Sequence, residues 1–273
     1  MTDVRDWQEG VGKAWAASWK LTDRSFAGLT AQLLDTLSGM PGRRVLDIGC
    51  GAGELSLALA RLRPDAEVIG VDVSADLLAA ARDRAGGNPR VRFIEADAAV
   101  WNGDGFEPDL LVSRHGVMFF DDPPAAFANL LDLAAPQARM IFSCFRSPQE
   151  NGWASGLAAL LPGGGPRPDP HAPGPFAFAD AGRVHALLEE AGWHGVRIEA
   201  RDFAYVAGTG DGPVADAMAF FQRIGPAAPV LRALEGEERQ AILERMERWL
   251  GGNLHDSMVV FPAAAWQVTA RKG

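Results

Sequence analysis

Several features that define other classes of protein are scarce or absent in this sequence of 273 residues. It has only two cysteines, Cys50 and Cys144, and they form neither a disulfide framework nor the spacing of a zinc site. No stretch approaches about 18 uninterrupted apolar residues, so no membrane span is expected. The N-terminus has no apolar region typical of a signal peptide. We therefore expect a cytoplasmic protein with free, buried thiols.

Positive charge is also in short supply. The formal net charge is −9 and the sequence pI is about 5.1, and the basic residues are interspersed with acidic ones. This balance argues against a non-specific nucleic-acid or anionic-membrane surface, because both would need a basic patch. The hydrophobic content of 48% is ordinary for a globular protein. The length suffices for one large domain, or for one domain with an insertion.

Between Arg43 and Phe145, short apolar stretches alternate with helical ones, as is typical of βαβ units with a parallel sheet. The strands expected in this region are 45–48, 68–71, 91–94, 109–113 and 140–145. Further along, 196–206 and 264–270 alternate with a period of two, which indicates antiparallel strands at the sheet edge. We therefore predict an α/β fold with a doubly wound, mostly parallel, seven-stranded sheet and an antiparallel C-terminal edge.

The chemistry of the chain centres on the loop Asp47-Ile48-Gly49-Cys50-Gly51-Ala52-Gly53, between the first strand and the following helix. Glycines there allow the backbone to turn sharply and to approach a ligand without Cβ collisions. The loop lies at the carboxyl end of a strand, where open α/β sheets bind ligands. Asp72 ends the second strand, where a carboxylate can accept hydrogen bonds from ribose hydroxyls. The pattern predicts an adenosine-type ligand.

Two classes of cofactor use this arrangement: dinucleotides, and nucleoside ligands that lack phosphate. The residues after the glycines distinguish between them. A dinucleotide fingerprint has a third glycine where this sequence has Glu54 or Ser56, depending on which glycine starts the count. The Glu54 carboxylate would also repel a pyrophosphate at the helix N-terminus. A nicotinamide cofactor, and with it an NAD-dependent oxidoreductase, is therefore disfavoured.

Four blocks in order resemble class I S-adenosylmethionine-dependent methyltransferases, nearest to the ubiquinone/menaquinone C-methyltransferase-like (methyltransferase type 11) group. They are VLDIGCGAG (45–53), VIGVDVS (68–74), FIEADAA (93–99) and DLLVSRHGVMFF (109–120). The segments 174–193 and 261–271 are similar as well, so only 1–25 and the helical insertion fall outside the resemblance. One departure is Pro136-Gln137-Ala138, where the group usually has Pro-Gly-Gly; we expect altered loop geometry there, away from the cofactor.

The resemblance implies roles for residues of this chain. The glycines would pass beneath the methionine and ribose, Asp72 would hold the ribose, and Asp97 would accept from the adenine amino group, although Asp97 could instead cap a helix. The implied S-adenosyl-L-methionine site, with S-adenosyl-L-homocysteine as product, comprises Asp47, Gly49, Cys50, Gly51, Gly53, Asp72, Val73, Leu77, Asp97, Ala98, Ser113 and Arg114. No metal ligands are evident.

The methyl acceptor would be enclosed by segments outside the cofactor domain. We expect a lid helix segment in 1–30, a cofactor-binding core in 31–145, and a C-terminal part, 146–273, that completes the sheet. Trp7, Trp15 and Trp19 recur at near-helical spacing and predict a substrate lid, although a helix simply packed on the domain would look the same. The flap 146–175 and the helical insertion 206–256 would complete the roof.

His115 is the histidine closest to the predicted active-site rim and is the candidate catalytic base; a packing role is the alternative. The expected reaction is direct displacement of the methyl group onto a small, partly apolar acceptor, accelerated by proximity and by exclusion of water. The acceptor atom and the oligomeric state are not predicted. A catalytically silent, cofactor-binding scaffold or regulator is the second hypothesis.

Overall fold

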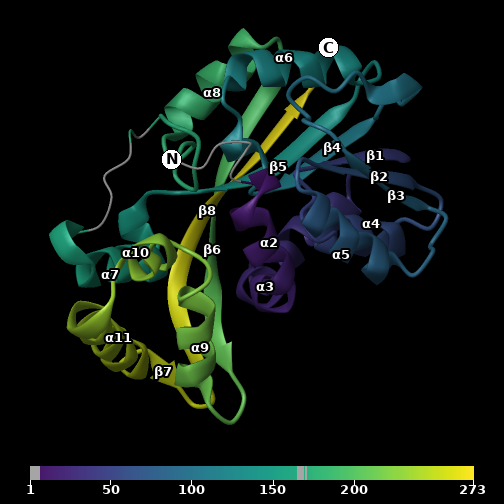
Figure 1. Ribbon diagram of the computed structural model, residues 1–273. Helices are drawn as coiled ribbons and strands as arrows, with labels where there is room; N and C mark the ends of the chain where they lie inside the picture. The colour runs from purple at the N-terminus through teal and green to yellow at the C-terminus, as the bar shows by residue number, and fades with distance from the viewer. Residues whose placement is uncertain (1–6, 165–168, 170) are drawn as a thin grey trace.

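The computed structural model describes residues 7–164, 169 and 171–273. Its centre is a single sheet with the strand order β3-β2-β1-β4-β5-β8-β6, and a short β7 pairs with β8 (Figure 1). The strands are β1 (Arg44–Ile48), β2 (Glu67–Asp72), β3 (Val91–Glu95), β4 (Leu110–Arg114), β5 (Arg139–Phe145), β6 (His194–Thr209), β7 (Leu254–His255) and β8 (Met258–Arg271). β1 to β5 are parallel, and β8 runs antiparallel to both of its neighbours. The predicted fold class is confirmed, with the two-residue β7 as an eighth strand.

Ten α-helices surround this sheet in the part of the chain that the structure describes. They are α2 (Gly10–Ala17), α3 (Trp19–Ser38), α4 (Glu54–Leu62), α5 (Ala75–Ala85), α6 (Pro123–Leu133), α7 (Gly152–Leu160), α8 (Ala181–Glu190), α9 (Pro213–Phe221), α10 (Ala227–Ala233) and α11 (Gly236–Gly251). Capping residues fix several of their ends. The Ser74 hydroxyl accepts from the Leu77 amide at the start of α5, and Gly86 ends that helix in a left-handed conformation.

The helices cover both faces of the sheet because adjacent strand residues point to opposite sides. In β1, Val45 packs in one buried cluster with residues of α3, α4 and α5, while its neighbour Leu46 packs in another with residues of α6 and α8. Both side chains are fully buried. A strand covered on both faces reads as a continuous apolar run, which is why β1 was recognisable in the sequence.

The C-terminal strands are longer than predicted. β6 and β8 stay paired from His194–Arg271 to Thr209–Met258, whereas β5 pairs only with the later half of β8. The two strands therefore extend beyond the sheet as a two-stranded arm, with β-bulges in β6 (Figure 1). The arm carries α9, α10, α11 and β7, so the predicted helical insertion lies at its far end.

The structure also bears on the cysteines, on the predicted flap and lid, and on membrane-spanning helices. Cys50 and Cys144 are free and buried, as predicted. The flap 146–175 contains helix α7, and residues 165–168 and 170 of this flap lie outside the described residues, as do residues 1–6 of the predicted lid. None of the helices in the described ranges combines the length and the apolar character needed to cross a membrane.

Candidate functional site

The loop after β1 turns through three glycines in the left-handed region. The φ angles of Gly49, Gly51 and Gly53 are 63°, 54° and 79°. A Cβ on Gly49 would lie 2.8 Å from the Cα of Gly116, so these two loops can meet only where both residues lack a side chain. A Cβ on Gly51, in contrast, would meet no atom within 4 Å. Gly51 therefore borders open space that a ligand can occupy.

Asp72 joins the end of β2 to this loop. Its carboxylate accepts the Gly51 amide at 2.8 Å through one oxygen and the Ser74 amide at 2.9 Å through the other. Burial raises the pKa of this carboxyl group, and the backbone donors of Ser74 and Gly51 partly oppose that rise. Each carboxylate oxygen has two acceptor positions, so both can accept a further bond from a ligand hydroxyl.

A single large cavity runs from this loop across the end of the sheet, with a volume of about 1360 Å³. That is more than the roughly 300–1,000 Å³ of a typical one-ligand pocket, so it can hold a cofactor and a second molecule. Most of the predicted site residues line it: Asp47, Gly49, Cys50, Gly51, Asp72, Val73, Leu77, Asp97, Ala98, Arg114, His115, Trp7, Trp15 and Trp19.

Two predicted cofactor residues lie behind the cavity wall. A Cβ on Gly53 would meet the Phe93 ring at 2.8 Å, so this glycine allows α4 to pack closely on the sheet. Ser113 is fully buried; its hydroxyl donates to the Ile48 carbonyl at 2.7 Å and accepts from the Gly116 amide at 3.1 Å. Both residues shape the loops and are not among the residues that line the cavity, so their contact with the cofactor stays a prediction.

Asp97 also lines the cavity and follows β3. Its carboxylate accepts the Ala99 amide at 2.9 Å, within a turn at residues 98–100. The alternative role of helix capping does not apply, because no helix begins there. One carboxylate oxygen of Asp97 has no partner among the described residues' hydrogen bonds, and it remains available to a ligand donor.

Charged residues between the glycine loop and the lid helix α3 form a connected network. Arg114, at the end of β4, forms an ion pair with Glu54 in the first turn of α4, and it donates to the Thr30 hydroxyl of α3 at 2.8 Å. Glu54 thus balances a cation inside the site, a role that the sequence did not reveal. The network connects helix α3 to the end of the sheet that carries the glycine loop.

A second ion pair in the same network was missed entirely. Asp23 of α3 pairs with Arg84 of α5 at 2.6 Å, and Arg84 also donates to the Ala52 carbonyl of the glycine loop at 2.7 Å. Burial, together with the nearby negative charge of Glu54, raises the pKa of Asp23 to about 6. The Arg84 guanidinium also lies 3.9 Å from the ring centre of Trp19, a cation–π contact.

Asp47 is the most deeply buried carboxyl group of this end of the cavity, at 1% exposure. Burial raises its pKa to about 7, although the Ser56 hydroxyl donates to it at 2.5 Å and the Arg114 charge also favours the ionised form. Asp47 therefore changes its charge near neutral pH. The carboxyl groups of Asp72 and Glu54 line the same end of the cavity.

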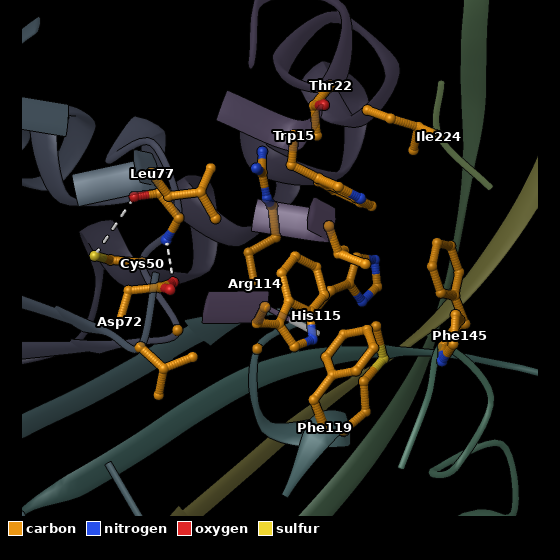
Figure 2. A pocket seen from close by; sticks show the side chains of 18 of the residues that line it. Trp15, Thr22, Cys50, Asp72, Leu77, Arg114, His115, Phe119, Phe145 and Ile224 are labelled. Carbon is orange, nitrogen blue, oxygen red and sulfur yellow. Dashed lines mark hydrogen bonds between the residues drawn. The ribbon is translucent and has the colours of Figure 1, made fainter. Parts of the chain in front are cut away.

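The other end of the cavity is walled by aromatic rings, and we call it the aromatic chamber. Its members come from both the lid and the C-terminal part: Trp7, Trp15, Phe26, His115, Phe119, Phe145, Trp153, Phe176 and Tyr205. Their rings contact one another in a chain, as in Trp7 with Trp15 at 5.4 Å and Trp153 with Tyr205 at 5.1 Å between ring centres. Figure 2 shows Asp72 and Cys50 on one side of the space and Phe145 and Ile224 on the other.

His115 lies where the two ends of the cavity meet. Its ring stacks on Phe145, with the centres 4.1 Å apart, and contacts Phe26 edge-on at 5.2 Å. Its backbone is left-handed, with φ of 62°, and its amide donates to the Ser143 carbonyl at 3.1 Å. Burial lowers its pKa to about 3, so the imidazole is neutral at pH 7. Such a weak base is poorly suited to remove a proton, which argues against the general-base role predicted for it.

From the sequence, only three of the nine chamber residues were named as site residues: Trp7, Trp15 and His115. The other six are Phe26, Phe119, Phe145, Trp153, Phe176 and Tyr205, and of these only Phe119 and Phe176 fall within segments that resemble the family. Otherwise, the sequence indicated only that the lid, flap and arm are rich in aromatic residues. It did not indicate which of these residues line the cavity. Within the described ranges, no group of three or more His, Cys, Asp or Glu side chains is arranged to hold a metal ion.

Part of the chain matches a known protein family: residues 45–137 match the family model described as "Methyltransferase domain". Among curated relatives, a trans-aconitate 2-methyltransferase of Methylobacterium radiotolerans is 37% identical over 106 residues, 39% of this chain and 39% of that protein. A phosphoethanolamine N-methyltransferase 1 of Triticum aestivum is 29% identical over 63% of this chain and 32% of its own length. The chain thus matches well under half the length of these relatives.

A solved structure extends the likeness to the whole fold. Phosphoethanolamine N-methyltransferase 2 of Haemonchus contortus, in complex with phosphomonomethylethanolamine and S-adenosylhomocysteine, superposes with a TM-score of 0.58. The superposition covers 100% of this chain and 60% of that one, at 16% identity. At that identity the likeness concerns the fold alone. The predicted methyltransferase class is confirmed, whereas the narrower resemblance to the ubiquinone/menaquinone group stays a prediction.

Proposed function

Since the chain belongs to the class I S-adenosylmethionine-dependent methyltransferases, we propose that it moves the methyl group of S-adenosylmethionine to a small, partly apolar acceptor by direct displacement. The observation that carries the proposal is the continuity of the cavity, which runs from the glycine loop and Asp72 to the aromatic chamber. One molecule at each end would meet beside His115. The cytoplasmic location predicted from the sequence is part of the same proposal.

The residues at the polar end fit this cofactor. The open space at Gly51 would admit it, and the Asp72 carboxylate would accept its ribose hydroxyls. Val73 and Leu77 would pack near the adenine, with Asp97 and the Ala98 amide at its edge. Asp47 and Glu54 supply negative charge for the ammonium group of the methionine part, with Arg114 for its carboxylate. S-adenosylmethionine supplies, when bound, an electrophilic methyl group on a positively charged sulfur.

The protein's own contribution would be positioning and exclusion of water. Trp7, Trp15 and Trp19 line the cavity from the lid side. The Asp23–Arg84 ion pair and the hydrogen bond from Arg114 to Thr30 attach the lid segment to the core. The carboxylates at the polar end would contribute to binding of the positively charged cofactor, which is a separate effect from acceleration of the transfer. The chamber rings would hold the acceptor with its reacting atom toward the methyl group.

The test uses the full chain and two separate measurements. Titration calorimetry with S-adenosylhomocysteine should give saturable binding, and labelled S-adenosylmethionine should transfer its methyl group to members of a broad acceptor panel. Binding without transfer to any acceptor would favour the scaffold hypothesis. Binding of NADH at micromolar concentration, with none of S-adenosylhomocysteine, would overturn the proposal.

A further inference from the structure

The aromatic chamber has walls that carry no formal charge at neutral pH. Eight of its nine residues are Phe, Trp or Tyr, and the ninth, His115, is neutral. The buried and half-buried charges of the cavity lie at the polar end, where Arg114 is already paired with Glu54. Arg223 and Arg232, which also line the cavity, are exposed. An acceptor with several negative charges would lose its hydration in the chamber without gaining an unpaired buried cation.

The chamber is also built from flat faces. Trp153 lies between Tyr205 and Phe176, with ring centres 5.1 and 6.1 Å away and interplanar angles of 16° and 25°. Aromatic side chains prefer offset-stacked and edge-on contacts with other rings. Walls of this kind favour a planar ligand over a branched or globular one.

One polar side chain of the chamber, the His115 imidazole, lacks the hydrogen-bond partners that buried polar groups normally have. Both ring nitrogens of His115 are buried without a hydrogen-bond partner among the described residues, and the side chain is 8% exposed. A neutral imidazole offers one donor and one acceptor. Buried polar groups are almost always satisfied, so an unpaired one in a ligand cavity indicates that the ligand supplies the partner.

The position of His115 fixes where that partner lies. Its neighbour Gly116 packs against Gly49 of the glycine loop, and its other neighbour Arg114 is tied to Glu54. The left-handed backbone of His115 is uncommon for a residue with a side chain, and such conformations occur at functional sites. The imidazole is therefore at the junction of the polar end and the chamber, where an acceptor would meet the methyl group.

Resting on the proposed function, we propose that the acceptor is an uncharged, planar aromatic molecule with a hydroxyl group, and that this hydroxyl forms a hydrogen bond with the His115 imidazole. His115 is then a specificity-determining residue that positions the acceptor. This acceptor class differs from the acids and phosphate esters in the names of the relatives.

The first test needs no variant. The complex with S-adenosylhomocysteine is titrated calorimetrically with 2-naphthol, with its isostere 2-methylnaphthalene, which lacks the hydroxyl, and with the anions 2-naphthoate and trans-aconitate. We expect 2-naphthol to bind at least about 10-fold more tightly than 2-methylnaphthalene, the scale of one buried hydrogen bond. The anions should bind more weakly still. Equal binding of the two neutral compounds, or tighter binding of an anion, would overturn the proposal.

The second test removes the ring nitrogens but keeps the stacking. His115→Phe should lower 2-naphthol affinity to that of 2-methylnaphthalene and leave the affinity for S-adenosylhomocysteine unchanged. His115→Asn, which tolerates the left-handed backbone and retains hydrogen-bonding groups, should preserve part of the preference. His185→Phe, at a partly exposed position of α8 outside the cavity, is the matched control and should change neither. If S-adenosylhomocysteine fails to bind the unaltered chain, the proposed function fails, and not this inference alone.

Discussion

The two ends of the cavity differ in how completely their polar groups are satisfied. At the polar end, Asp47, Asp72, Glu54 and Arg114 each have a hydrogen-bond or ion-pair partner within the protein. In the aromatic chamber, His115 and the indole nitrogens of Trp7 and Trp153 are buried with none among the described residues. The polar end is thus organised before any ligand arrives, whereas on the proposal above a ligand would supply the missing partners of the chamber. Substitutions at one end should therefore leave the other end unaffected.

The largest effect should come from the glycine at the centre of the polar end. Gly49→Ala adds a Cβ that meets the Gly116 backbone at 2.8 Å and forces an alanine into a left-handed conformation. These two costs together should lower the free energy of unfolding by about 4 kcal/mol. Gly51→Ala, whose Cβ meets nothing, should lower it by only about 1–2 kcal/mol while still obstructing cofactor binding. Denaturant unfolding and calorimetry separate the two effects, and equal destabilisation would contradict the close approach of the loops.

The second-largest expected effect is a pH dependence of the free energy of unfolding, caused by Asp47. The pKa of Asp47 is raised to about 7, so wild-type stability should fall as the pH rises from about 4 through 7, because the ionised form is disfavoured in the folded state. Asp47→Asn removes this cost and keeps an acceptor for Ser56. Its stability advantage should widen by about 2–3 kcal/mol between pH 5 and pH 8. Chemical denaturation at both pH values measures it; a constant difference would show that Asp47 does not titrate in this range.

A smaller effect tests the ribose contact. Asp72→Ala should weaken S-adenosylhomocysteine binding by about 1–3 kcal/mol, because a charged hydrogen-bond partner is lost. Glu95, directly opposite Asp72 in the β2–β3 register but exposed and outside the cavity, provides the control Glu95→Ala, which should have no effect. Calorimetric affinity that is unchanged in Asp72→Ala would refute the ribose assignment.

The smallest effect concerns the chamber alone. Ile224, between α9 and α10, is buried and lines the cavity, whereas Ile242 in α11 is buried in the same insertion but does not. Each change to Val removes one methylene-sized group, worth about 0.8 kcal/mol of burial. Ile224→Val should raise the KM for the acceptor by up to about fourfold, and Ile242→Val should not. Neither should alter cofactor affinity; a matching change in that affinity would break the separation of the two ends.

The polar end was largely predictable because its residues follow the carboxyl ends of successive parallel strands. The glycines, Asp72 and Asp97 follow buried strands that are legible as apolar runs, and parallel strands bring their carboxyl ends to one edge. Gly53 and Ser113 belong to the same segments but lie behind the cavity wall, where Gly53 allows a helix to pack closely and Ser113 supports a neighbouring loop. The position of a residue in the motif does not show whether it contacts a ligand or packs against the protein.

The aromatic chamber could not be predicted in the same way. Phe26, Phe145, Trp153, Phe176 and Tyr205 lie on elements far apart in the sequence, and their meeting depends on how the long arm strands and the lid pack. An aromatic residue on a helix or strand looks the same in sequence whether it faces a core or a cavity. The pKa shifts of Asp23 and His115 also depend on burial, which tertiary packing alone determines.

The arm formed by β6 and β8 has a consequence for how such an enzyme can diversify. Its strands pair with each other well past the end of β5, so the insertion they carry can be lengthened, shortened or replaced without disturbing the hydrogen bonds of β1, β2 and β4. Ile224 and Tyr205 reach the chamber from this arm. Acceptor specificity can therefore diverge through changes in this arm while the proposed methyl-donor site around Gly51 and Asp72 stays unchanged.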